Sequence, residues 1–155
     1  MTFPIGLSNR HLEMWSLRRG GQTLSKIAGK LGVSRQAVSQ ALMGVEEKIE
    51  KTLLGAASAS RIKVEHIDAT KGILKGYSYE MNDDVVVTFS PNNGVQVWHY
   101  YEGRCDTCQL YKECMKLIQK EAEERGIPLD KEILKKKPAV IARKVFGQIL
   151  DEEFD

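Results

Sequence analysis

The chain has few of the residues on which most enzymatic chemistry depends. It contains three histidines in 155 residues, and it lacks a glycine-rich phosphate loop, an HExxH motif and a GxSxG motif. No Ser/His/Asp set is recognisable, and general bases are scarce. We therefore expect the protein not to be an enzyme.

Cysteine is also rare, and long hydrophobic runs are missing. The three cysteines are an odd number and two of them form a CxxC pair, which argues against a disulfide framework and for a reducing compartment. The first residues, MTFPIGLSNR, lack the basic start and apolar run of a secretory signal. We expect a cytoplasmic protein that does not associate with a membrane.

The net charge is low, but it is unevenly distributed. The formal charge of the whole chain is +2, whereas residues 1–45 contain six basic side chains against Glu13 alone. Residues 61–155 contain 15 basic and 17 acidic side chains. A basic N-terminal part on a nearly neutral remainder favours nucleic-acid binding by the first part and another task for the second.

Residues 24–41, LSKIAGKLGVSRQAVSQA, have the pattern of a helix-turn-helix. Leu24, Ile27 and Leu31 fall at helical spacing and predict one apolar face. Gly32 stands where a left-handed residue would end the first helix, and Ser34 stands where a side-chain oxygen would cap the second. The pattern predicts that the second helix enters the DNA major groove. Two amphipathic helices in another kind of bundle are the alternative.

The outward side chains of that second helix suit the edges of bases and phosphate groups. Arg18 and Arg19 close an earlier helix that begins at Ser8, and we expect them to contact phosphates, although a solvated helix end explains them equally well. The predicted partner is double-stranded DNA. The predicted DNA-binding residues are Arg18, Arg19, Ser34, Arg35, Gln36, Ser39 and Gln40.

About the first 55 residues resemble the Tfx family of archaeal transcriptional regulators, whose DNA-binding head is similar to region four of sigma factors and to the LuxR-type head. The resemblance implies a dimeric, sequence-specific DNA-binding regulator. An adaptor that binds RNA polymerase through a sigma-like head is a further alternative. The matching features are Arg10, Leu12, Leu17-Arg18-Arg19-Gly20, Ile27-Ala28, Leu31-Gly32, Ser34-Arg35, Val38-Ser39 and Ile49-Glu50-Lys51.

The apolar pattern of the second helix continues beyond Ala41 in a seam close to a heptad repeat. We favour a homodimer contact for this seam, while a helix that packs on its own second domain would show the same stripe. The seam consists of Leu42, Val45, Ile49 and Leu53. The small residues 55–60 then predict a hinge between two domains, with an alanine-rich helix end as the alternative.

The sequence predicts an α+β fold with a boundary near residues 57–61. Residues 1–57 form a three-helix DNA-binding head with an extended third helix, and residues 61–155 form a dimerisation or sensor domain. In that second domain, residues 61–103 read as four antiparallel strands with an Asn92-Asn93-Gly94 turn, and amphipathic helices after residue 110 cover the sheet.

A cysteine cluster follows the predicted strands. Cys105 and Cys108 form the CxxC pair and Cys114 follows six residues later, a spacing that suits Zn²⁺ or an iron–sulfur cluster. His99 is the nearest candidate for a fourth ligand, and His66 and His11 are weaker ones. Zinc is favoured because no fourth cysteine is present, although three packing cysteines are an alternative. A metal- or iron–sulfur-bearing redox or catalytic module that the head targets to DNA is the second functional hypothesis.

Overall fold

The computed structural model describes residues 6–100 and 105–151, and it has an α+β architecture with a four-stranded antiparallel sheet, as predicted. None of the helices in these residues is both long and apolar enough to cross a lipid bilayer. In chain order the elements are α1 (Asn9–Arg19), α2 (Leu24–Leu31), α3 (Arg35–Ala59), β1 (Ile62–Asp68), β2 (Ile73–Ser78), β3 (Asp83–Ser90), β4 (Gly94–His99), the 3₁₀ turn η1 (Cys105–Thr107), α4 (Tyr111–Glu124), α5 (Lys131–Leu134) and α6 (Pro138–Leu150).

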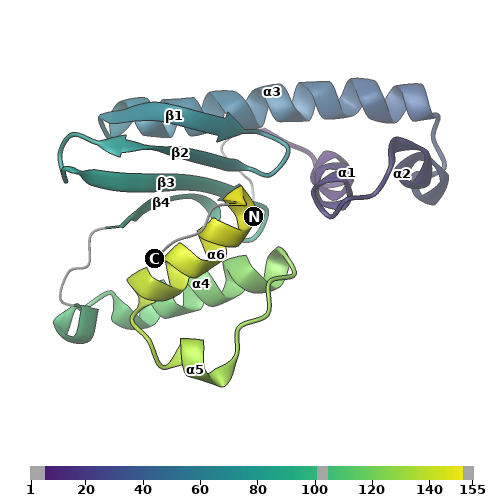
Figure 1. Cartoon of the computed structure of the whole chain (residues 1–155). Coiled ribbons are helices and arrows are strands. Elements are labelled where there is room, and N and C mark those ends of the chain that lie inside the picture. Colours follow the sequence, from purple (N-terminus) through teal and green to yellow (C-terminus); the bar gives the residue numbers. More distant parts are fainter. Residues whose placement is uncertain (1–5, 101–104, 152–155) are drawn as a thin grey trace.

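The sheet lies between two layers of helix (Figure 1). Its strands follow the chain order β1-β2-β3-β4, and α3 covers one face while α4 and α6 cover the other. The alternation of side chains along β3 explains this arrangement, since Val85 and Val87 face the α3 cluster and Val86 faces the cluster of α4 and α6. A sheet with two apolar faces must be covered on both.

The prediction that the α3 seam is a dimer contact is wrong. Leu42, Val45, Ile49 and Leu53 are each 4% exposed or less, and they share one hydrophobic cluster with residues of the sheet such as Leu74. The seam looked like a heptad repeat because a helix that crosses a sheet also needs an apolar stripe with helical spacing. A homodimer would have to use another surface.

The predicted hinge at residues 55–60 is also wrong, and the alternative of an alanine-rich helix end is confirmed, because this segment forms the last turns of α3 and ends at the C-cap Ser60. Its small side chains have a packing role, since Ala57 is buried in the cluster between α3 and the sheet. The N-terminal helices belong to the same cluster. Trp15 of α1 lies edge-on to Phe89 of β3, with ring centroids 5.3 Å apart. The two predicted domains therefore share a core.

A buried carboxylate fixes α4 to the sheet. Glu121 is completely buried, and it accepts hydrogen bonds from Ser90 Oγ at 3.2 Å and Asn93 Nδ2 at 2.9 Å, both next to the β3–β4 turn. Arg125 Nε donates to the same carboxylate at 2.7 Å, and its NH2 donates to the Phe89 carbonyl at 3.1 Å. A buried charge is tolerated when it is paired and fully hydrogen-bonded, as here. The predicted turn at Asn92-Asn93-Gly94 is confirmed by the pairing of Ser90 with Gly94.

Candidate nucleic-acid interface and cysteine cavity

Two capped helices and a glycine turn build the predicted recognition segment. Gly32 adopts φ +68°, where a side chain would be strained, and its N–H donates to the Ala28 carbonyl to end α2. Ser34 Oγ then accepts a hydrogen bond of 3.1 Å from the Ala37 N–H at the start of α3. The predicted roles of Gly32 and Ser34 in the backbone are confirmed. Thr23 caps α2 in the same way, a role that the sequence analysis missed.

The first turns of α3 present one buried side and one free side. Val38 is completely buried, whereas Arg35, Gln36 and Gln40 are exposed and Ser39 is half-buried. The free side continues to Met43, which is 69% exposed and lies three residues after Gln40. Side chains separated by three or four residues share a helix face. Met43 is not among the DNA-binding residues predicted from the sequence, although its spacing from Gln36 and Gln40 places it on the same helix face.

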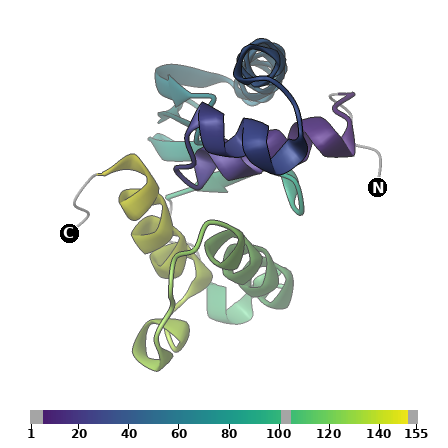
Figure 2. The same ribbon diagram turned by 90° about the vertical axis from the view of Figure 1, so that its right-hand side faces the viewer.

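The N-terminal helices carry three more exposed cations, which are not among the DNA-binding residues predicted from the sequence. Lys26 and Lys30 are one helical turn apart on α2, and Arg10 lies on α1. Arg10 NH2 is 3.4 Å from the Leu31 carbonyl, so α1 contacts the end of α2 next to the Gly32 turn. Figure 2, which looks along α3, shows α1 and α2 side by side below its N-terminal end.

Arg19 is not available for DNA, so this part of the prediction is wrong. Its side chain is 9% exposed, its NH2 lies 3.3 Å from Glu124 Oε1, and its guanidinium stacks 4.8 Å from the centre of a Trp15 ring. Burial, followed by the positive charge of Arg125, lowers the pKa of Arg19. Arg18 is half-buried, and its NH1 donates to the Gln22 carbonyl at 3.0 Å, which leaves only part of the guanidinium for another ligand.

The four predicted metal ligands line a single cavity of about 550 Å³. Cys105, Cys108 and Cys114 are free thiols, and His99 is the last residue of β4. Within residues 6–100 and 105–151, the observed side-chain conformations form no group of three His, Cys, Asp or Glu residues that could hold a metal ion. The remaining wall is largely apolar and consists of Met81, Val97, Trp98, Leu110, Tyr111, Pro138, Ala139 and Ala142.

The thiols of this cavity influence one another. Partial burial is the main cause of a raised pKa at Cys114, and the neighbouring Cys108 and Cys105 raise this pKa further. The Leu110 N–H lies 3.4 Å from Cys108 Sγ and donates to it. The weaker ligand candidates are elsewhere, since His66 is on β1, at the opposite edge of the sheet from β4, and His11 is on α1.

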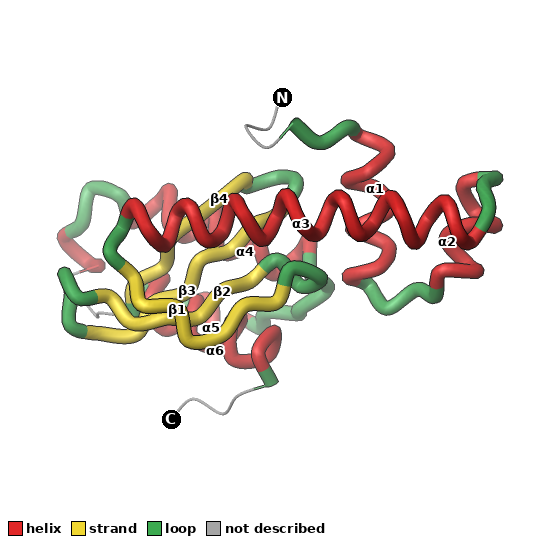
Figure 3. The backbone as a smooth tube through the Cα atoms, turned by 90° about the horizontal axis from the view of Figure 1, so that it is seen from above, coloured by secondary structure: helices red, strands yellow, loops and turns green. Residues whose placement is uncertain are grey.

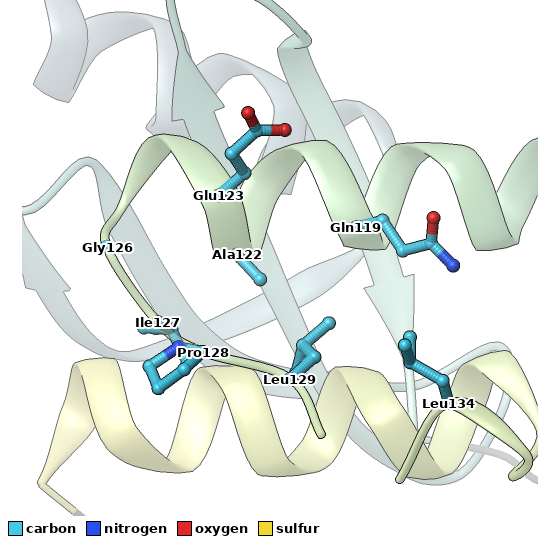
Figure 4. A pocket seen from close by; sticks show the side chains of 8 residues that line it. All are labelled: Gln119, Ala122, Glu123, Gly126, Ile127, Pro128, Leu129 and Leu134. Atoms are coloured by element: carbon cyan, nitrogen blue, oxygen red, sulfur yellow. The ribbon is translucent and has the colours of Figure 1, made fainter. Parts of the chain in front are cut away.

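A second cavity, also of about 550 Å³, lies between α4 and the segment that follows it (Figure 4). Aliphatic side chains such as Leu129 and Leu134 form its wall, and Glu123 points away from it. A binding site usually combines an apolar wall with a few converging polar groups. The polar side chains of this cavity do not converge, so we assign no function to it.

Comparison of the chain with protein-family models, with curated proteins and with solved structures finds no match.

Proposed function

We propose that the protein is a sequence-specific, double-stranded DNA-binding regulator in which the start of α3 enters the major groove. The observation that carries this proposal is the free polar face of α3 at Arg35, Gln36 and Gln40, beside the exposed lysines of α2. The resemblance of the first 55 residues to Tfx-type regulators agrees with it.

The position of this face supports the proposal. An α-helix rises 1.5 Å per residue, so the 25 residues of α3 extend roughly 37 Å. Figure 3 shows that the C-terminal part of α3 lies across the sheet, while its N-terminal part extends beyond the sheet toward α2. The start of the helix therefore projects from the sheet, and its exposed face is accessible to a duplex.

The side chains on the free face match the chemistry of base edges. Gln36 and Gln40 each offer an amide that can donate and accept at adenine, and Arg35 can donate two hydrogen bonds to guanine or contact a phosphate. Met43 adds an exposed apolar group one turn after Gln40, suited to a thymine methyl group. This combination predicts sequence preference in addition to electrostatic attraction.

Phosphate contacts would come from the exposed cations of the neighbouring helices. Lys26 and Lys30 lie on α2, the helix that precedes the recognition segment, and Arg10 adjoins its end. Each phosphate contact releases condensed counterions, so binding should weaken steeply as salt rises. Arg18 contributes less, because the Gln22 carbonyl already occupies its NH1 group.

The test begins with selection of a binding site from random duplexes with the full chain. Affinity for the selected duplex and for a scrambled one is then measured by fluorescence anisotropy at several salt concentrations. We expect Arg35→Ala/Gln36→Ala to lose most of the preference for the selected duplex, by about 1–3 kcal/mol for each base contact removed. Lys26→Ala/Lys30→Ala should weaken binding to both duplexes and reduce the salt dependence.

A matched control removes one cation and one glutamine elsewhere. Lys51 and Gln119 are exposed and lie on the far part of α3 and on α4, so Lys51→Ala/Gln119→Ala should bind as wild type does. Equal affinity of the wild-type protein and the Arg35→Ala/Gln36→Ala variant for the selected duplex would contradict the assigned interface. Failure of the selection to enrich any sequence would contradict sequence-specific binding itself.

A further inference from the structure

The η1 turn and the start of α4, which carry the cysteines, lie at the opposite end of the molecule from α2 (Figure 1). The proposed recognition of DNA uses none of the side chains that line the cysteine cavity. The concentration of all three cysteines of the chain on one wall therefore requires a separate explanation.

We propose that this cavity is a structural zinc site with Cys105, Cys108, Cys114 and His99 as ligands. Three thiolates and one imidazole are a donor set that Zn²⁺ takes in tetrahedral structural sites. This inference does not depend on DNA binding.

Three elements of the fold deliver these ligands to the cavity. Cys105 and Cys108 flank the η1 turn, which is closed by a 3.2 Å hydrogen bond from the Cys108 N–H to the Cys105 carbonyl. Cys114 lies in the first turn of α4, where its N–H donates to the Leu110 carbonyl at 2.8 Å. His99 ends β4. The cysteines of a tight CxxC turn can contact an ion from one side. A cysteine on the following helix can contact the same ion from another side.

The surroundings of the thiols suit a bound cation. The Leu110 N–H that points at Cys108 Sγ would stabilise negative charge on that sulfur, as hydrogen bonds from the surrounding protein do at metal sites. The cavity wall is mostly apolar, with Trp98, Val97 and Ala142 among its members. Such a wall excludes water from the side of the ligands that it contacts, while Cys108 itself is exposed.

Binding requires the ligand side chains to turn toward one point, because the observed conformations hold no ready group of three ligands among the described residues. A cysteine has a single side-chain torsion before its sulfur, and Cys108 is exposed, so these rotations meet little resistance. Formation of a metal site is commonly coupled to local folding in this way. The bound ion would then link the end of β4 to the start of α4.

The first experiment measures the metal content of the full chain, purified under reducing conditions, by elemental analysis. We expect one zinc per chain, and release of that zinc when the thiols of the wild-type protein are modified. Exchange for Co²⁺ should produce the thiolate-to-cobalt absorption of a tetrahedral site. These measurements need no substitution, so they remain decisive if a cysteine variant does not fold.

The second experiment assigns the ligands. Cys108→Ser and Cys114→Ser should each lose stoichiometric zinc and the cobalt absorption, and His99→Ala should bind zinc at least tenfold more weakly. The matched control is His66→Ala, because His66 is an exposed strand histidine at the opposite sheet edge and should not affect metal content. Circular dichroism of each variant separates loss of the site from loss of the fold.

Three results would overturn the zinc site, and a fourth would overturn its ligand set. The first is reduced wild-type protein that contains no zinc and gives no cobalt absorption. The second is a Cys108→Ser variant that keeps the full zinc content. The third is iron with inorganic sulfide in place of zinc, which would make the site an iron–sulfur centre. An unchanged affinity in His99→Ala would overturn the four-ligand set proposed here.

Discussion

Arg19 at the end of α1 and Glu124 at the end of α4 form an ion pair of 3.3 Å although they are 105 residues apart in the chain. The same guanidinium lies over a ring of Trp15, and its NH2 group also contacts the Glu124 carbonyl at 3.3 Å. This pair joins the N-terminal helices to the helical layer on the far side of the sheet. The ion pair explains why Arg19, which the sequence predicts to contact phosphates, is instead enclosed in the fold.

We predict that Glu124→Ala lowers the free energy of unfolding by about 3 kcal/mol, because it leaves the buried Arg19 without its ionic partner. Chemical denaturation measures this change. The control is Glu47→Ala, which breaks the exposed ion pair with Lys51 and should cost less than about 1 kcal/mol.

Replacement of both partners separates the charge effect from simple loss of packing. Arg19 NH1 and Glu124 Oε2 are buried without a hydrogen-bond partner, so the pair is incompletely satisfied. Arg19→Met/Glu124→Met should therefore be less destabilised than Glu124→Ala alone. The loss of unfolding free energy in the double variant is compared with the losses in Arg19→Met and Glu124→Met. If it equals their sum, the two side chains are not coupled.

Gly72 is predicted to be intolerant of a side chain. A Cβ at this position would lie 2.6 Å from the Phe89 carbonyl oxygen and 2.8 Å from the Trp15 ring, and the residue has φ +68°. Gly72→Ala should cost about 3 kcal/mol from overpacking, with about 1–2 kcal/mol more from the left-handed backbone. Thermal or chemical denaturation would measure the loss.

Gly94 provides the matched control for this substitution. It has φ +66°, but a Cβ there would meet no atom within 4 Å. Gly94→Ala should therefore show only the backbone penalty of about 1–2 kcal/mol. Equal losses in the two variants would mean that the contact of Gly72 with Trp15 and Phe89 contributes nothing.

Substitutions at Ser34 can separate helix capping from DNA binding. Asn and Asp both cap helices as well as Ser does, so Ser34→Asn and Ser34→Asp should unfold within roughly 0.5 kcal/mol of wild type. Only the aspartate adds a negative charge next to Arg35, at the start of the proposed recognition helix. We expect Ser34→Asp to weaken DNA binding by about tenfold, or ~1.4 kcal/mol, and Ser34→Asn to weaken it far less. Equal DNA affinities in anisotropy titrations would place Ser34 away from the duplex.

The features that the sequence predicted well are those determined by neighbouring residues. The glycine turn at Gly32, the cap at Ser34 and the strand-rich stretch with its Asn-Gly turn depend on local backbone preferences. The presence of His99 and the three cysteines in the lining of one cavity also follows from short separations along the chain.

The features that could not be predicted depend on contacts between distant segments. Nothing next to Arg19 in the sequence indicates Glu124 as its partner. The seam on α3 has the same period whether it faces a sheet or a second helix, so its spacing alone could not distinguish the two. Met43 shares its helical spacing with Gln36 and Gln40, but its exposure runs against the usual burial of methionine.

Substitutions on α3 can test whether the seam packs within one chain. Ile49 is completely buried in the cluster between α3 and the sheet, so Ile49→Ala should cost about 3 kcal/mol by leaving a cavity. Met43→Ala, on the exposed face of the same helix, should leave stability nearly unchanged. If the seam packs within one chain, the loss in Ile49→Ala will be the same at low and high protein concentration. If the seam instead joined two chains, the melting temperature of the wild-type protein would rise with concentration and Ile49→Ala would remove that dependence.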